Sequence, residues 1–189
     1  MMKTKLISAV CLALALSLCA GCGEKAEVSS SSSEAGSAVS SDSAEPTPAP
    51  SPAFAIKVPD GFTESEMPGT LAYYTSEDGA VISLTTSAKD PDFSTPDLDA
   101  LVGALHPVYS EQLHEDNMQI EVVSTTDDPV CGFPAYQAEL KCTGTGYEFS
   151  QLFVGIDADM TYTWVFTGSE DQMDLFRKCA ESITNTIDL

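Results

Sequence analysis

The chain has 189 residues and carries 29 acidic against 8 basic side chains, which gives a formal net charge of −21 at pH 7. Nucleic acids and anionic lipid surfaces bind clusters of lysine and arginine, so this charge excludes a generic nucleic-acid-binding protein and argues against electrostatic adhesion to membranes. The length allows one ordinary domain with extra segments, and two changes of composition divide the chain into residues 1–21, 22–53 and 54–189.

The first part has the composition of a secretory signal peptide. Lys3 and Lys5 precede an apolar run over residues 6–18. A helix of that length rises roughly 20 Å, which is too short to cross a hydrocarbon core of about 30 Å. The sequence therefore predicts a cleaved leader and not a membrane span.

A cysteine follows this leader in a distinctive context. Ala20 and Gly21 are small residues directly before Cys22. This order resembles the lipobox of bacterial lipoproteins, and the resemblance implies cleavage before Cys22 and attachment of lipid to its sulfur. The pattern departs at the third position before the cysteine, where Cys19 stands in place of the usual leucine. Cys19 and Cys22 also have the spacing of a redox or metal pair, but such a pair needs a surrounding fold, which an apolar leader and a serine tract do not provide.

Residues 22–53 lack the large apolar side chains that offset the entropy lost on ordering. Serine, alanine and acids dominate the first half, and prolines occupy alternate positions from Pro46 to Pro52. We expect a disordered tether, flexible at first and then extended as polyproline II. Thirty extended residues reach on the order of 100 Å, enough to lift a domain off a membrane. The prolines could instead bind an SH3-type domain, an interpretation that an extracytoplasmic location disfavours.

Residues 54–189 contain the recurring aromatic and β-branched side chains of a folded domain. Phe54, Ile56 and Val58 alternate as in a strand, and the turn residues of 59–61 end it. Residues 71–86 predict a β-hairpin with its tip at 76–79.

A helix is predicted after this hairpin. Ser94 or Thr95 can cap it, with Pro96 in its first turn and acids near its positive end. Pro107 is expected to kink or divide it. Its apolar positions recur at helical spacing: Leu98, Leu101, Val102, Leu105, Val108, Tyr109 and Leu113.

Four strands follow, at about 118–125, 133–142, 147–156 and 160–167. The short connections between the last three favour antiparallel neighbours, because parallel pairing needs a long crossover. Two sets of alternating residues are expected to face the core: Tyr162, Trp164 and Phe166 in the last strand, and Tyr136, Ala138, Leu140 and Cys142 in the second.

A final helix is predicted over 170–186, with Ser169 as its cap. Its expected buried side consists of Leu175, Phe176, Cys179, Ala180 and Ile183. The order of elements predicts an α+β domain in which a mainly antiparallel sheet carries helices on its faces.

Three stretches of this domain carry a resemblance to a known family. They are the opening Phe54-x-Ile56-x-Val58-Pro59-x-Gly61-Phe62, the strand entry Gly132-x-Pro134-Ala135-Tyr136, and the aromatic strand 162–166 that leads through Thr167-Gly168 to the last helix. Together they resemble the PsbP-like family, whose fold occurs in photosystem extrinsic proteins, a Ran-binding nuclear factor and many bacterial lipoproteins. The resemblance covers nearly all of 54–189 and implies an α-β-α sandwich with a binding or assembly role. No functional residue of that family has an identifiable match in this chain.

The sequence predicts no catalytic residue, no cofactor and no metal site. His106 and His114, eight residues apart, would lie roughly 12 Å apart on a straight helix, which is too far for one metal ion. The nucleophile elbow, the H-E-x-x-H motif, the P-loop and the dinucleotide fingerprint are all missing. Ser-His-Asp chemistry is not excluded by composition, since serine and aspartate are plentiful.

Clustered carboxylates raise the question of calcium. They occur in 90–99, 114–116, 127–128 and 157–159, and none has the spacing of an EF-hand loop. Asp97 and Asp99 stand where acids favour a helix start in any case. The simplest explanation of the acidic surface is that it keeps the protein soluble through self-repulsion, and the alternative is that it recruits cations or a basic partner.

Cys131, Cys142 and Cys179 remain after the leader and the anchor. An odd number leaves at least one unpaired, and we expect three buried thiols. A bridge, if one formed, would involve Cys179, because Cys131 and Cys142 are predicted near opposite ends of one strand.

The sequence as a whole predicts a lipoprotein held on the outer side of the bacterial cell membrane by lipid on Cys22. We expect a non-catalytic binding or assembly module with a protein partner. The alternatives are a receptor domain for a small molecule or cation, an envelope enzyme, and a purely structural spacer.

Overall fold

The computed structural model describes residues 53–89, 98–114 and 117–186. The predicted leader, Cys22 and the tether up to residue 52 lie outside these ranges, as do the predicted helix-start residues Ser94, Thr95 and Pro96. No helix in the described ranges has both the length and the apolar character of a membrane span.

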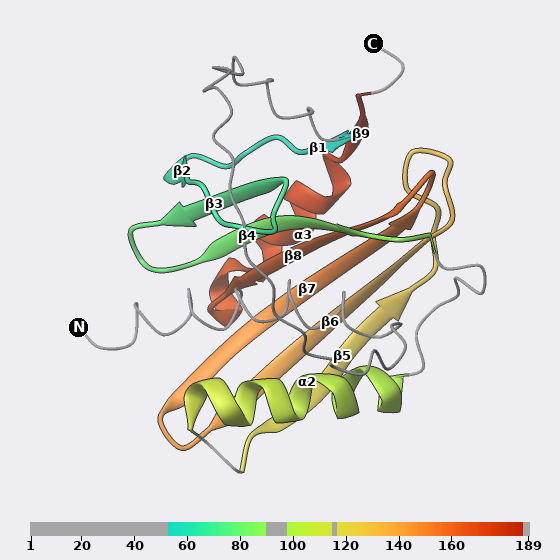
Figure 1. Cartoon of the computed structure of the whole chain (residues 1–189). Coiled ribbons are helices and arrows are strands. Elements are labelled where there is room, and N and C mark those ends of the chain that lie inside the picture. The colour runs from blue at the N-terminus through green and yellow to red at the C-terminus, as the bar shows by residue number, and fades with distance from the viewer. Residues whose placement is uncertain (1–52, 90–97, 115–116, 187–189) are drawn as a thin grey trace, which may run out of the picture.

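Within these ranges the chain forms one sheet of seven strands, with every neighbouring pair antiparallel (Figure 1). The spatial order is β2 (Phe62–Glu64), β3 (Ala72–Ser76), β4 (Val81–Ser87), β8 (Thr161–Gly168), β7 (Tyr147–Asp157), β6 (Ala135–Gly144) and β5 (Gln119–Thr126). The predicted hairpin is β3 and β4, with Gly79 at its tip in the left-handed region (φ 89°), where glycine is favoured. The predicted four strands are β5 to β8, and the prediction of antiparallel neighbours is confirmed.

Helices lie on both sides of this sheet. Helix α2 (Leu98–Leu113) runs along the β5 and β6 side of one face. Helix α3 (Met173–Glu181), preceded by the short 3-10 helix η2 (Glu170–Gln172), packs on the opposite face against β7. This arrangement confirms the predicted α+β sandwich.

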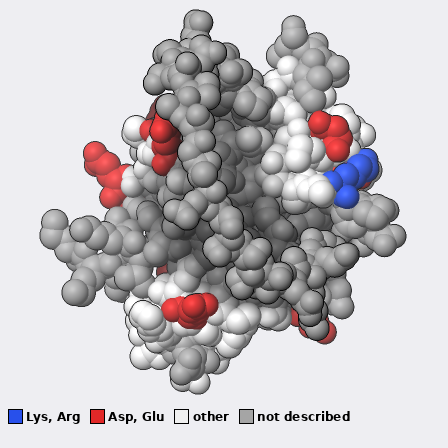
Figure 2. Space-filling model, viewed as in Figure 1, with Lys and Arg blue, Asp and Glu red and all other residues white. Residues whose placement is uncertain are grey.

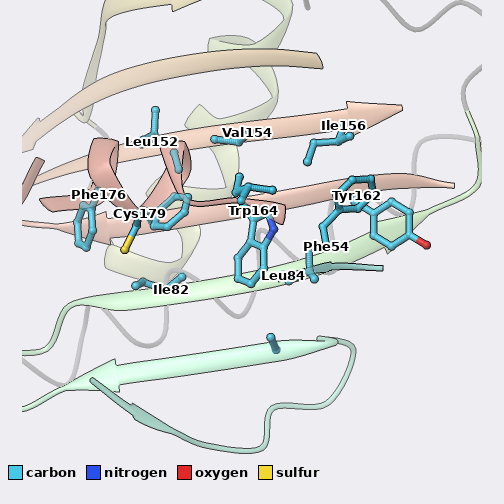
Figure 3. Packing of buried hydrophobic residues seen from close by; sticks show 14 of the residues in the cluster. Phe54, Ile82, Leu84, Leu152, Val154, Ile156, Tyr162, Trp164, Phe176 and Cys179 are labelled. Carbon is cyan, nitrogen blue, oxygen red and sulfur yellow. The ribbon is translucent and has the colours of Figure 1, made fainter. Parts of the chain in front are cut away.

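The core has two layers because alternate residues of a strand point to opposite faces. On the α3 side, Tyr162 and Trp164 of β8 lie in one cluster with Phe54 and Phe176 (Figure 3). Phe166 of the same strand belongs to this cluster and packs against Phe176. The second predicted set lies on the α2 side: Ala138, Leu140 and Cys142 are buried there, and Tyr136 packs against them. Both sets therefore meet the core, on opposite sides of the sheet.

Strands β1 (Phe54–Ala55) and β9 (Thr184–Asn185) form a separate antiparallel pair. The two ends of the described chain thus lie side by side (Figure 1), and the Thr186 N–H donates to the Ala53 carbonyl at 2.8 Å. The strand predicted over 54–58 is shorter than expected, because its pairing ends at Ala55.

Helix α2 is continuous through Pro107, so of the two predicted effects, a kink or a division, the division is wrong. Proline removes one hydrogen bond to the carbonyl four residues earlier, here that of Gly103. Pro107 and Gly103 are both exposed, so water can bond the released carbonyl.

The C-terminal helix begins where predicted and ends early. The backbone N–H of Ser169 donates to Gln172 Oε1 at 2.9 Å, which supports the predicted cap. The helix ends at Glu181, because the chain turns at Ser182 to form β9. Phe176, Cys179, Ala180 and Ile183 are buried as predicted, but Leu175 is 39% exposed, and Met173 is buried in the place predicted for it.

Candidate functional site

The described domain is acidic and has few basic groups. In Figure 2, acidic side chains appear at several separate places on this face, whereas basic atoms are seen only near its right edge. The basic residues of 54–189 are Lys57, Lys89, Lys141, Arg177 and Lys178. Their partners decide which positive charges are available to a ligand.

Three of these residues are neutralised by carboxylates of the domain itself. Lys89 Nζ lies 3.4 Å from Asp157 Oδ2. Lys141 Nζ lies 2.6 Å from Glu170 and 3.2 Å from Glu148, and the hydrogen bond to Glu170 raises the pKa of the Lys141 ammonium.

Arg177 is held most firmly of the three. Its guanidinium donates to both carboxylate oxygens of Glu139, at 2.8 and 3.1 Å, and also to Asp174 at 2.5 Å. The side chain of Glu139 is only 8% exposed, so this ion pair joins α3 to β6 at a place from which water is partly excluded. The hydrogen bonds that Arg177 donates to Glu139 raise the pKa of the guanidinium.

Lys57 and Lys178 form no ion pair with the described residues, and both line the same hollow. This hollow has a volume of about 390 Å³, and Val58, Pro59, Asp60, Leu175, Cys179 and Ser182 complete its lining. The two basic groups without a carboxylate partner in this part of the chain are therefore brought together beside an exposed leucine.

Helix periodicity places one wall of the hollow. Leu175, Lys178 and Ser182 follow one another at spacings of three and four, so they fall on one side of the helix. The adjacent buried side, with Met173, Phe176 and Ala180, fixes α3 on the sheet. An exposed stripe is thus presented by a helix whose orientation the core determines.

Hydrogen bonds attach the second wall to the first. The Lys57 N–H donates to Ser182 Oγ at 2.9 Å, and the Ser182 hydroxyl in turn donates to the Cys179 carbonyl at 2.7 Å. The Cys179 thiol donates to the Lys57 carbonyl at 3.5 Å. These bonds fix the backbone of Lys57 and leave its ammonium group exposed.

A second hollow of about 650 Å³ continues the first and shares Asp60 and Leu175 with it. Its lining includes Glu77, Asp78 and Gln172, and Gln172 Nε2 donates to Asp78 Oδ2 at 2.7 Å. We call the two hollows together the α3 groove. Lys57 and Lys178 form its basic end, Glu77 and Asp78 form its acidic end, and Asp60 and Leu175, which line both hollows, lie between the two ends.

Another hollow, of about 620 Å³, lies between 146–149 and 169–171. Glu148 and Glu170 line it, but Lys141 bridges them. Over residues 53–89, 98–114 and 117–186 no group of three or more histidine, cysteine or acidic side chains is positioned to hold a metal ion. The predicted acidic stretch 90–97 lies outside the described residues.

The two histidines have different surroundings on α2. His106 is half-buried, with its Nδ1 3.5 Å from the hydroxyl of Ser110 one helical turn away. His114 is exposed at the end of α2, in the left-handed region with φ 52°. A contact between neighbouring turns of one helix lacks the third, orienting group of a catalytic triad.

The three described cysteines are free thiols. Cys142 and Cys179 are buried as predicted, but Cys131 is exposed. The reason is a tight turn in which Cys131 (φ 53°) and Gly132 (φ 83°) connect the paired residues Val130 and Phe133. A residue at the tip of such a turn cannot join the core.

Alkylation with iodoacetamide is expected to separate these thiols. Burial raises the pKa of Cys142 to about 12, so this thiol is both covered and protonated at neutral pH. In the native protein, Cys131 should react on the order of a hundredfold faster than Cys142. Peptide mass spectrometry at timed intervals measures both rates, and denaturing urea should make them similar. Equal rates in the native state would contradict the burial of Cys142.

Sequence reasoning missed the residues of the α3 groove. Leu175 was predicted to be buried, and Lys57 and Lys178 are 121 positions apart with no motif to connect them. The predicted lipid site, Cys22, lies outside the described residues.

No protein-family model and no curated protein sequence matches the chain. Among solved structures, the chain is similar to cyanobacterial PsbP (CyanoP) from Synechocystis sp. PCC 6803, with a TM-score of 0.55 and 17% identity over 70% of this chain and 86% of that one. A Pseudomonas aeruginosa protein of unknown function, PA94, matches with a TM-score of 0.35 and 13% identity over 66% of this chain and 92% of that one. The second likeness is too distant to carry an argument. The first shows that the described domain has a PsbP-like fold.

Proposed function

We propose that this protein is a lipid-anchored, extracytoplasmic binding module without catalytic activity, and that it binds a protein partner through the α3 groove. One observation carries the proposal: the two lysines without an ion pair in the described domain line the same groove as the exposed Leu175. In a chain of net charge −21, most lysines are expected to have a carboxylate neighbour. Lys57 and Lys178 form no ion pair within the described domain. Unneutralised charges beside an apolar contact are typical of a recognition surface.

The described polar groups favour binding over catalysis. A nucleophile needs a base within hydrogen-bond reach and a group that orients this base. The closest arrangement found in the described ranges is the local contact between His106 and Ser110, on the half-buried side of α2. In the groove itself, burial raises the pKa of the Cys179 thiol and so works against formation of a thiolate.

The anchor is tested by replacing Cys22. In cells supplied with labelled palmitate, the Cys22→Ala variant is expected to lose the label and to leave the membrane fraction. Cys19→Ala is the matched control, because it removes the other cysteine of the pair, and it should keep both label and location. Label that persists in the Cys22→Ala variant would contradict the proposed anchor.

The binding role is tested by photocrosslinking in intact cells. We place benzoylphenylalanine at position 175, inside the groove, or at position 160, where Met160 has the same 39% exposure on the turn between β7 and β8. The proposal predicts a discrete crosslinked protein at position 175 that is absent at position 160. Equal crosslinking at both positions, or a co-purifying metabolite with no crosslinked protein, would contradict it. A co-purifying metabolite would support the small-molecule receptor instead.

A further inference from the structure

We infer that the α3 groove recognises an extended peptide segment with opposite charges at its two ends. The segment places carboxylates against Lys57 and Lys178, an apolar side chain on Leu175, and basic side chains against Asp60 and Glu77. This inference rests on the proposed binding function and specifies the chemistry of the partner.

The basic end attracts a carboxylate through charge, because it lacks the planar pair of hydrogen-bond donors that an arginine would present. Both groups are lysine ammoniums, which act as compact charges with rotatable donors. The nearby Ser182 hydroxyl already donates to the Cys179 carbonyl and accepts from the Lys57 N–H. Its donor is therefore occupied, and the two ammoniums supply the positive charge at this end.

The middle of the groove is apolar. Leu175 is one of the few large apolar side chains of the described domain that are exposed, and Val58 and Pro59 line the same hollow. An apolar side chain that covers Leu175 would remove this surface from water. Because both hollows share Leu175 and Asp60, the apolar contact lies between the two charged ends, with the Asp60 carboxylate beside it on the way to Glu77.

The acidic end has the opposite charge, and hydrogen bonds hold the loop that carries it in place. Asp78 accepts hydrogen bonds from Ser76 and Gln172, which holds the turn of the β3–β4 hairpin against the start of α3. Asp60 and Glu77 are exposed and have no ion pair with described residues. Lysine or arginine of the partner would meet these two carboxylates.

The charge pattern disfavours two other occupants. The tether of this chain, residues 22–53, holds five acids and a single lysine, so it could satisfy the basic end but not the acidic end. An anionic lipid headgroup has the same shortcoming, because the carboxylates at the other end of the groove would repel it. A segment with both charges matches the whole groove.

The order of charges in the partner is the property to test, with the lipidated full chain in detergent micelles. The probes are three fluorescein-labelled hexapeptides: acidic-first (Glu-Glu-Leu-Leu-Arg-Arg), basic-first (the reverse order), and uncharged (glutamine in place of every charge). Fluorescence anisotropy measures binding. One of the two charged peptides is expected to bind at least about tenfold more tightly than both other probes, and high salt should weaken this binding.

Four variants connect this preference to the groove. Lys57→Glu with Lys178→Glu should weaken the preferred peptide at least about tenfold. Adding Asp60→Lys and Glu77→Lys should reverse the preference between the two charged peptides. Lys57→Arg with Lys178→Arg should keep the original preference, and so should Lys89→Gln, which removes a basic group outside the groove. Circular dichroism confirms that each variant is folded.

Three outcomes would overturn the inference: equal binding of all three peptides, no binding of any, or no reversal in the charge-swapped groove. Loss of binding to phosphatidylglycerol vesicles in the Lys57→Glu, Lys178→Glu variant, without any peptide preference, would assign the groove to a lipid headgroup. The inference fails separately from the proposed function, because a partner crosslinked at position 175 with no dipolar segment at the crosslink would leave that function in place.

Discussion

Truncation of Phe176 to alanine is expected to lower the free energy of unfolding by about 3–5 kcal/mol, because it leaves a cavity in the core. The ring is fully buried, with its centroid 5.8 Å from that of Phe166 and 6.4 Å from that of Phe62. Urea unfolding followed by circular dichroism measures the change.

The neighbouring residue supplies a matched control for this truncation. Leu175→Ala removes an exposed side chain of similar chemistry from the same helix, and it should cost less than about 1 kcal/mol. If both variants lost the same stability, Phe176 would not be the residue that fixes α3 on the sheet. The Leu175→Ala variant should also lose binding in the groove while it stays folded. The Phe176→Ala variant cannot distinguish lost binding from lost stability, because it affects both.

Replacement of Gly155 by valine is expected to destabilise the domain by about 3 kcal/mol through overpacking. Gly155 pairs with Tyr136 across β6 and β7, and a Cβ atom at this position would lie 2.2 Å from Tyr136 Cε1 and 2.6 Å from its Cζ. The Tyr136 ring is half-buried against the α2 side of the core, where desolvation raises the pKa of its phenol, so a side chain at position 155 must displace the ring from this packing. Thermal and urea unfolding both measure the effect.

A second glycine and a double variant test this explanation. Gly103→Ala lies in helix α2 with nothing within 4 Å of the added Cβ, so it should be neutral or stabilise the domain by up to about 1 kcal/mol. In the Gly155→Val, Tyr136→Ala double variant the loss should be clearly smaller than the sum of the two single losses. Additive losses would mean that the ring and the new side chain do not compete for space.

The strands and hairpins of the domain could be predicted from local chemistry. Alternating aromatic and β-branched residues with glycine-containing turns between them indicate antiparallel strands, and the structure has β3 to β8 close to the predicted positions. Short connections decided which strands are neighbours. The same pattern predicted that Trp164 and Leu140 face the core, although not that they lie on opposite faces of the sheet.

The elements that were wrong depend on contacts between distant segments. Helical spacing alone cannot decide whether Met173 or Leu175 is buried, because this depends on how far α3 rotates when Phe176 packs on the sheet. The helix stays continuous at Pro107, where the released carbonyl of Gly103 is on an exposed side, and the exposure of this side of α2 is not visible in the sequence. Strand β1 ends early because its partner is β9, from the far end of the chain.

The candidate site could be predicted even less. Its basic end depends on which lysines lack a carboxylate neighbour, and all five basic residues of the domain look equivalent in the sequence. Only folding pairs Arg177 with Glu139 and Lys141 with Glu170, and so leaves Lys57 and Lys178 without partners in the described domain. One sequence signal was useful: Leu175 is an apolar residue on a helix that already has enough other apolar residues to form its buried side.

The pairing of β1 with β9 connects the basic end of the α3 groove to the N-terminal end of the described domain. Tension along the chain before Ala53 would act first on this two-residue pair and on the buried ring of Phe54. Lys57 lies two residues after β1, so detachment of β1 would also pull Lys57 away from Ser182 and disrupt the basic end. The seven-stranded sheet has no strand pairing with β1 or β9, but it would lose the contact between the rings of Phe54 and Tyr162. For a domain anchored and binding as proposed above, the affinity of the α3 groove is therefore expected to fall when the chain before Ala53 is pulled.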